Sequence, residues 1–153
     1  MTERSVAHAT FTIERHYDAA PARAFKAFSD PAAKRRWFAE GEGWDIETYT
    51  LDFRIGGSES SRFRFKGGPL ITFDAVYQDI VPGQRIITAY AMTVDGNRIS
   101  VSLGTTQFEP SGAGTRLVYT EQGAFLDGYD GAGQREHGSR ELFEALAREL
   151  SRT

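Results

Sequence analysis

The sequence predicts an α+β fold in which a curved antiparallel sheet of seven strands packs against two short helices and one long C-terminal helix. Glycine- and proline-rich turn signals recur at strand-length intervals through the middle of the chain. Proline-opened helical stretches follow the first strand, and a long amphipathic segment closes the chain. No repeat, linker or low-complexity tract interrupts the 153 residues. We therefore expect a single domain over residues 1–153.

The N-terminal part is expected to form one strand and two short helices. Apolar and polar side chains alternate over Phe11–Tyr17 with the period of two that is typical of a strand. Pro21 follows at a first helical position, where its missing N–H leaves no hydrogen bond unmade. Asp30 and Pro31 repeat this signal as an N-cap followed by proline, so a second helix should run to about Phe38. The two helices should meet at a kink.

Six further strands are expected between residues 45 and 123, because turn residues separate β-rich runs there. Asp95-Gly96 between two such runs is a strong hairpin signal. The predicted strands are Tyr49–Ile55, Ser60–Lys66, Leu70–Ile80, Arg85–Val94, Arg98–Glu109 and Thr115–Gln122. The run Leu70–Ile80 carries apolar residues on both faces, so its inward face stays open.

The final helix, expected over Ala132–Ser151, has a buried stripe that changes character along its length. At 3.6 residues per turn, the C-terminal half of this stripe holds three leucines, Leu142, Leu146 and Leu150. The N-terminal half holds Arg135 and Ser139 instead, while His137 lies on the opposite, exposed face. A polar group that faces a sheet needs a partner or water. Arg135 therefore pairs with an inward acid such as Glu121, borders a wet cavity, or is solvated beyond the sheet edge.

Two charged residues on predicted strands are candidates for the interior. Arg15 shares a strand face with Ile13 and Tyr17, and Glu121 shares one with Tyr119. If these faces point inward, each charge lies in an apolar setting where its pKa can shift. Glu121 could then act as a general base towards a polyketide or another enolisable ligand. A structural ion pair or hydrogen bond is the simpler interpretation.

Aromatic side chains could form the wall of a ligand pocket. The chain holds eleven Phe, six Tyr and two Trp, and such rings fill a core or line a pocket. The candidates for the wall are Trp37, Phe63, Phe65, Tyr77, Tyr90 and Phe125. Filling of an ordinary core is the alternative for any single ring. As a set, they suit a pocket, because the facing half of the final helix carries no ring.

Several classes of function are not supported by the residues present. There is no cysteine, the three histidines are dispersed, and no metal-binding or nucleotide-binding motif occurs, so we expect no metal and no cofactor. The net charge is −3 and the basic residues are scattered, which disfavours nucleic acid. No signal peptide or membrane-length apolar run is evident, so we expect no membrane association and a cytoplasmic location. Lys34-Arg35-Arg36 is interpreted as a solvated helix face or, alternatively, a protein-docking patch.

The residues from Phe11 to Trp37 combine a strand, a proline-opened helix with aromatic side chains, an Asp-Pro pair and a tryptophan. This pattern resembles the opening of the SRPBCC (START-like, Bet v-like) superfamily. Within it, the chain is similar to the branch related to the C-terminal domain of the activator of the heat shock protein 90 ATPase. The resemblance continues through Ile55-Gly56-Gly57, Phe73–Arg85, Gly114-Thr115-Arg116 and Glu121–Leu146.

The resemblance implies a helix-grip fold with a cavity between the sheet and the long helix. Members bind hydrophobic or aromatic small molecules, act as polyketide cyclases, or contact a chaperone. The branch often has Gly-Trp near the start of the final helix, where this chain has Gly138-Ser139. Loss of that ring would enlarge or wet the cavity at this level.

We therefore expect non-catalytic binding of a small hydrophobic or aromatic molecule in the cavity. A polyketide cyclase-like or hydrolase-like enzyme that uses an inward carboxylate is one alternative. A co-chaperone-like interaction module that stimulates a partner ATPase is another. A homodimer is also expected, on the general frequency of paired assemblies. The candidate ligand-binding residues are Arg15, Trp37, Phe63, Phe65, Tyr77, Tyr90, Glu121, Phe125, Arg135 and Ser139.

Overall fold

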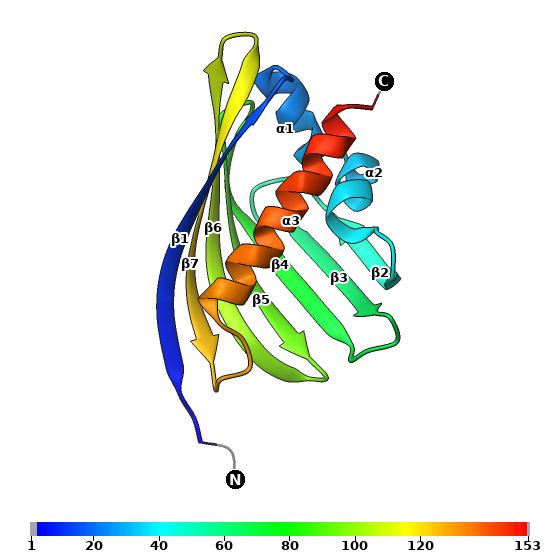
Figure 1. Ribbon diagram of the computed structural model, residues 1–153, viewed down its shortest axis with the longest axis vertical. Helices are drawn as coiled ribbons and strands as arrows, with labels where there is room; N and C mark the ends of the chain where they lie inside the picture. Colours follow the sequence, from blue (N-terminus) through cyan, green and yellow to red (C-terminus); the bar gives the residue numbers. More distant parts are fainter. Residues whose placement is uncertain (1–2, 153) are drawn as a thin grey trace.

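All seven strands belong to one antiparallel sheet, and the long helix α3 (Ala132–Leu150) lies across its concave face (Figure 1). The computed structural model describes residues 3–152. The strand order is β1-β7-β6-β5-β4-β3-β2, so β1 pairs with the last strand and every other neighbour is consecutive in sequence. This arrangement confirms the predicted α+β helix-grip fold.

The strands are β1 (Val6–Tyr17), β2 (Trp44–Leu51), β3 (Ser58–Phe65), β4 (Ile71–Val81), β5 (Arg85–Val94), β6 (Asn97–Ser111) and β7 (Gly114–Leu126). The prediction was wrong for the second strand, which begins at Trp44 and ends at Leu51. Beyond it the backbone turns so tightly that position 57 must be glycine. A Cβ there would lie 2.1 Å from the carbonyl oxygen of Asp52. Residues 52–57 therefore form the turn into β3.

A bulge decides the orientation of β4, which the sequence left open. The pairing of β4 with β5 shifts between Tyr77 and Asp79. Before this point Tyr77 faces the interior while Val76 is exposed. After it, the extra residue reverses the alternation, so that Ile80 packs against the core. The bulge thus lets Tyr77 and Ile80 face the same side of the sheet, although they are three residues apart in the sequence.

The two short helices predicted after β1 are present as α1 (Pro21–Ser29) and α2 (Pro31–Lys34). As expected of an N-cap, the Asp30 carboxylate accepts a hydrogen bond from the backbone N–H of Ala32. The chain then continues as a π-helical turn, η1 (Arg35–Ala39). Here the Trp37 indole N–H donates to the carbonyl oxygen of Ala27 at 2.8 Å, which fixes this turn against α1.

The core lies at the end of the sheet that α1 covers (Figure 1). Phe28 meets Trp37 and Phe108 edge to face, with ring centroids 4.9 and 5.2 Å apart. Ile13 and Leu146 are fully buried beside them. Among residues 3–152, neither α3 nor any other helix combines the length and apolarity needed to cross a membrane. The N-terminal half of α3 lies beyond this core, where a cavity opens.

Candidate ligand-binding cavity

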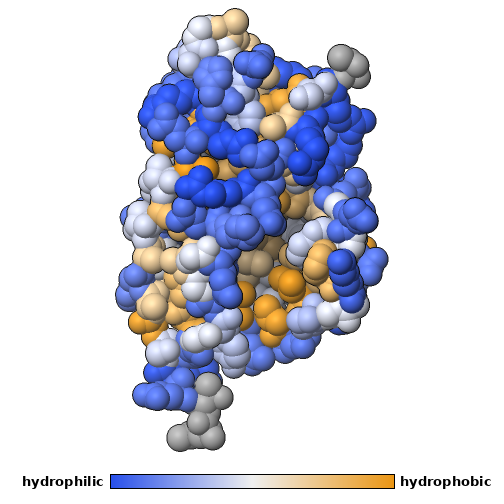
Figure 2. Space-filling model, viewed as in Figure 1, coloured by the Kyte–Doolittle hydropathy of each residue, from blue (hydrophilic) through white to orange (hydrophobic). Residues whose placement is uncertain are grey.

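A cavity of about 670 Å³ lies between α3, η1 and the inner face of the sheet. Figure 2 shows apolar side chains gathered in a recess beside α3. Six of the ten predicted residues line it: Trp37, Phe63, Tyr77, Tyr90, Arg135 and Ser139. Further rings that the sequence analysis did not single out for the wall complete it, among them Phe28, Phe38, Trp44 and Phe73. The wall is thus mainly aromatic.

Small residues on the sheet and on α3 leave room for the cavity between them. On the sheet side, β6 contributes Gly104 and Thr106 to the wall, and on the helix side α3 contributes Gly138 and Ser139. A larger residue in place of Gly104 would have to displace the Tyr119 ring, because a Cβ there would lie 2.9 Å from the Tyr119 hydroxyl. The small side chain of Ser139 lines the cavity and contributes no ring to its wall.

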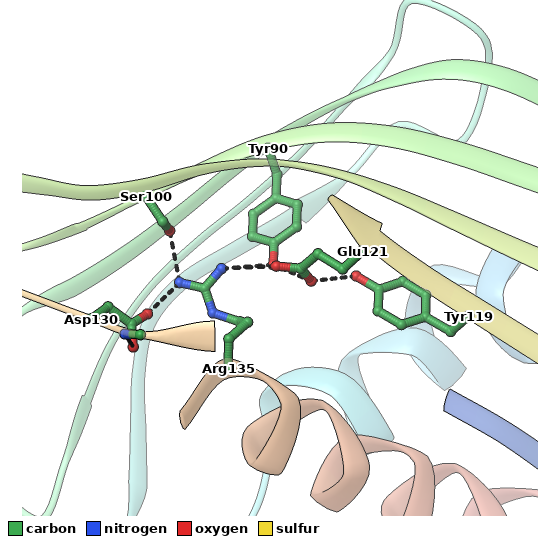
Figure 3. A network of polar contacts seen from close by, with 7 residues as sticks. Tyr90, Ser100, Tyr119, Glu121, Asp130 and Arg135 are labelled. Carbon is green, nitrogen blue, oxygen red and sulfur yellow. Dashed lines mark hydrogen bonds and ion pairs between the residues drawn. The ribbon is translucent and has the colours of Figure 1, made fainter. Parts of the chain in front are cut away.

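At one end of the cavity, Arg135 is held in a network that joins α3 to three strands and to the preceding loop (Figure 3). One guanidinium nitrogen donates to the Tyr90 hydroxyl at 2.9 Å and to the Glu121 carboxylate at 3.2 Å. The other donates to the Ser100 hydroxyl at 2.7 Å and to the Asp130 carboxylate at 2.6 Å. The Arg135–Glu121 pair is the ion pair that the sequence suggested.

Glu121 completes this network as the acceptor for two tyrosines. The hydroxyls of Tyr90 and Tyr119 both donate to one of its oxygens, at 2.7 and 2.6 Å. Burial, followed by the charge of Glu121, raises the pKa of Tyr90, and the pKa of Tyr119 is also raised, chiefly by burial. Burial alone would lower the pKa of Arg135, but Tyr90, Glu121 and Asp130 outweigh it and raise this pKa. The network therefore holds neutral phenols around a permanent ion pair.

A second buried ion pair, which the sequence analysis missed, lies at the other end of the cavity. Lys34 donates to one oxygen of Glu59 at 3.0 Å, and both residues line the cavity. Tyr77 donates to the same oxygen at 3.0 Å and Tyr49 to the other at 2.6 Å. Glu59 is only 1% exposed. Burial and then the Glu59 charge raise the pKa of both tyrosines.

Aromatic rings surround the Lys34 ammonium group. Its nitrogen lies 4.3 Å from the ring centroid of Phe38, and the rings of Phe28 and Trp37 are within 5.6 Å. Such rings attract a cation through their negative faces. A signal for this was present in the sequence, since Lys34 and Trp37 are three residues apart and share a helix face.

The interpretation of Lys34-Arg35-Arg36 as a solvated helix face is wrong for Lys34, which is buried. Lys34 points into the protein, whereas Arg35 pairs with Glu40 at 2.9 Å. Arg36 forms a two-bond pair with Glu149 on α3, at 2.9 and 2.7 Å. The three side chains diverge because the helical turn sends neighbouring residues in different directions.

Four predicted site residues lie outside the set that lines the cavity. Arg15 is on the inner face of β1, but it pairs with Glu144 of α3 at 2.9 Å. Phe65 is 42% exposed at the end of β3 and packs on Trp44. Phe125 is buried under the Arg135 guanidinium, 5.4 Å from it, and so supports the wall from behind. Glu121 is likewise buried behind the tyrosines that face the cavity.

Residues 18–151 match the family model described as Activator of Hsp90 ATPase homolog 1-like protein. The chain belongs to this family. The match includes both ion pairs and every residue that lines the cavity. It confirms the resemblance inferred from the sequence. No curated protein matches the chain significantly.

Solved structures of similar proteins share this family's fold. Protein Mll3558 from Rhizobium loti is 54% identical, with a TM-score of 0.88, over 95% of this chain and 99% of that chain. An uncharacterised protein from Rhizobium leguminosarum is 47% identical, with a TM-score of 0.95, over 99% of this chain and 100% of its own. Protein CV1439 from Chromobacterium violaceum is 25% identical, with a TM-score of 0.78, over 94% and 98% of the two chains.

Proposed function

We propose that the protein binds a small hydrophobic or aromatic molecule, without chemical change, in the cavity between the sheet and α3. The observation that carries this proposal is a cavity of about 670 Å³ with an aromatic wall. Ligand sites in proteins span roughly 300–1,000 Å³ and are mostly apolar with a few polar groups. The two ion pairs supply polar groups of this kind at the ends of the cavity.

The state of the two buried carboxylates favours binding over catalysis. Glu59 and Glu121 each accept hydrogen bonds from two tyrosines and one cationic side chain. A general base must reach a substrate proton directly or through one water. Glu121 is outside the cavity wall, so a cyclase or hydrolase that uses this carboxylate would first have to break its network.

A protein-interaction role is a second candidate, and one observation favours it apart from the family description. Trp44 and Phe65 are 39% and 42% exposed, and their ring centroids lie 4.6 Å apart. Exposed aromatic pairs are common at the centres of protein interfaces. An interaction module would stimulate the ATPase of a chaperone partner, and Trp44→Ala would abolish this stimulation.

The binding proposal is tested by native mass spectrometry of the purified protein, followed by a thermal-shift screen of fatty acids, flavonoids and polyketide-like aromatics. A retained ligand, or a stabilisation of several degrees, supports binding. Ser139→Trp would restore a ring inside the cavity and should abolish the shift, while Ser139→Ala should keep it. Equal shifts in Ser139→Trp and the wild type would contradict binding in this cavity.

The proposal includes a cytoplasmic location and a homodimer, as expected from the sequence. The absence of cysteine suits a reducing compartment. Size-exclusion chromatography with light scattering checks the dimer, and a monomer at micromolar concentration would contradict it.

A further inference from the structure

One end of the cavity holds hydrogen-bond donors that lack acceptors. An ammonium group has three N–H bonds. Within residues 3–152, the only hydrogen bond of the buried Lys34 ammonium is the one to Glu59. Ser61 follows two residues after Glu59 on the same strand face, lines the cavity and is 2% exposed, yet its hydroxyl has no partner there. Buried polar groups are rarely left in this state.

The acceptors beside these donors are already in use. One oxygen of Glu59 accepts from Lys34 and Tyr77, and the other accepts from Tyr49 at 2.6 Å. The donors without partners are therefore N–H and O–H, and a ligand that satisfies them must bring an acceptor atom with free lone pairs, for which an oxygen is the common choice.

The charged groups around Lys34 limit which kind of ligand oxygen can bind beside it. Lys34 and Glu59 cancel each other, so the pair attracts no net charge. A ligand carboxylate would lie near the Glu59 carboxylate, and two further acids, Glu40 and Glu42, line the same cavity. Like charges at short range in a poorly hydrated site repel strongly. An uncharged carbonyl oxygen accepts hydrogen bonds without this penalty.

The other ion pair offers no comparable vacancy. Both terminal guanidinium nitrogens of Arg135 have two acceptors each. The hydroxyls of Tyr90 and Tyr119 both donate to Glu121. Among the described residues only the Arg135 Nε–H has no hydrogen-bond partner, so a ligand that used any other polar group there would have to displace one of these bonds.

We propose that Lys34 and Ser61 form a subsite for the carbonyl oxygen of an aromatic ketone or quinone. The inference rests on the proposed binding function and adds the chemical class of the ligand. The carbonyl oxygen accepts from the Lys34 ammonium and the Ser61 hydroxyl, while the aromatic body packs among rings such as Phe38 and Phe73. The Lys34–Glu59 pair remains intact when the ligand is bound.

The test compares 9-fluorenone with fluorene, which has almost the same shape but lacks the carbonyl oxygen. Dissociation constants are measured by calorimetry on the wild type. Fluorenone should bind about tenfold more tightly than fluorene, as expected for hydrogen bonds from a charged donor. Fluorenone-2-carboxylate should bind more weakly than fluorenone.

Two serine variants form a matched pair for this test. Ser61 and Ser102 are both buried and both lack hydrogen-bond partners, but only Ser61 lines the cavity. Ser61→Ala should weaken fluorenone binding several-fold and leave fluorene binding unchanged. Ser102→Ala should change neither constant. The double variant Lys34→Met/Glu59→Gln, which leaves no unpaired charge, should remove the remaining preference for fluorenone.

Each outcome has a defined meaning. Equal binding of fluorenone and fluorene by the wild type, or no effect of Ser61→Ala, would overturn the subsite and leave the binding function standing. Tighter binding of the carboxylate would overturn the choice of an uncharged oxygen. If neither ring system binds and no compound of the wider screen does, both the subsite and the proposed function fail.

Discussion

The two ends of the cavity are built from the same parts but leave different groups free. Each has a buried carboxylate that accepts from two tyrosines and one cation: Glu59 with Lys34, and Glu121 with Arg135. The planar guanidinium of Arg135 binds four acceptors at once, whereas the ammonium of Lys34 binds one. At the Arg135 end both terminal nitrogens are thus fully paired and tie α3 to the sheet, whereas the Lys34 end keeps more donors for a ligand.

The largest effect is expected from Arg135→Met. It leaves the buried carboxylate of Glu121 and the partly buried carboxylate of Asp130 without their cation. Loss of one partner of a buried ion pair typically lowers the free energy of unfolding by about 3–5 kcal/mol, and two carboxylates suggest the upper part of this range. Urea denaturation measures the change in unfolding free energy. A loss below about 1 kcal/mol would mean that the network contributes little to holding α3 on the sheet.

Lys34→Met should destabilise the protein less, by about 3 kcal/mol, because one carboxylate is left unpaired instead of two. Adding Glu59→Gln should recover much of this loss, since the neutral amide leaves no unpaired charge and its single oxygen still accepts from one of the two tyrosines. The same urea experiment on both variants gives the coupling between them. An additive double variant would show that the pair is not coupled.

Alkaline pH should affect both ends through their tyrosines. The pKa values of Tyr49, Tyr77 and Tyr90 are raised in the folded protein, above the ordinary 10.0. The unfolded chain therefore releases these protons first, so the unfolding free energy is fully present below pH 10 and falls as pH rises above it. Each such tyrosine contributes a slope of about 1.4 kcal/mol per pH unit there.

Tyrosine variants check this slope. Tyr49→Phe and Tyr90→Phe should each make the fall between pH 10 and 11 smaller by about 1 kcal/mol, since the full slope develops only above this interval, whatever their effect at neutral pH. Denaturation curves at several pH values measure it. An unchanged slope in Tyr90→Phe would mean that its phenol ionises normally in the fold.

The smallest effect is expected at the Arg36–Glu149 pair, which lies outside both ends of the cavity. The hydrogen bonds from Arg36 hold the pKa of Glu149 below its ordinary 4.5. This stabilisation is present above pH 4.5 and is lost as the carboxylate is protonated below it. Arg36→Met should thus differ from the wild type at neutral pH and converge with it in acid, as seen in acid-unfolding curves. A constant difference would contradict the pairing.

The difference between the two ends also explains how far the sequence could be interpreted. Arg135 and Glu121 lie on long regular elements, where periods of 3.6 and 2 fix the direction of each side chain. Their pairing could therefore be predicted. Lys34 lies between a four-residue helix and a π-helical turn, where the helical period changes. Glu59 lies one residue before the predicted start of its strand, Ser60, so the sequence analysis assigned it no inward direction.

The alternation of side chains along a strand also gave wrong site predictions for two strand residues. Phe65 alternates with charged residues and so resembles a core residue, yet it ends β3 beyond the cover of α3 and η1 and is exposed. Arg15 does face inward, but it meets Glu144 of the helix before it can reach the cavity. Alternation gives the face of a strand, whereas the elements packed over that face decide what each residue contacts.

The sequence by itself determined the order of strands and helices along the chain and the final helix with its apolar and polar halves, and it offered the aromatic wall and one of the two ion pairs as candidates. These features follow from periodicity and turn chemistry, which act over neighbouring residues. The tertiary structure alone decided that Lys34 meets Glu59 and that Ser61 lies unpaired beside them. The reason is physical: whether a buried donor has a partner depends on residues that the fold brings together from distant parts of the chain.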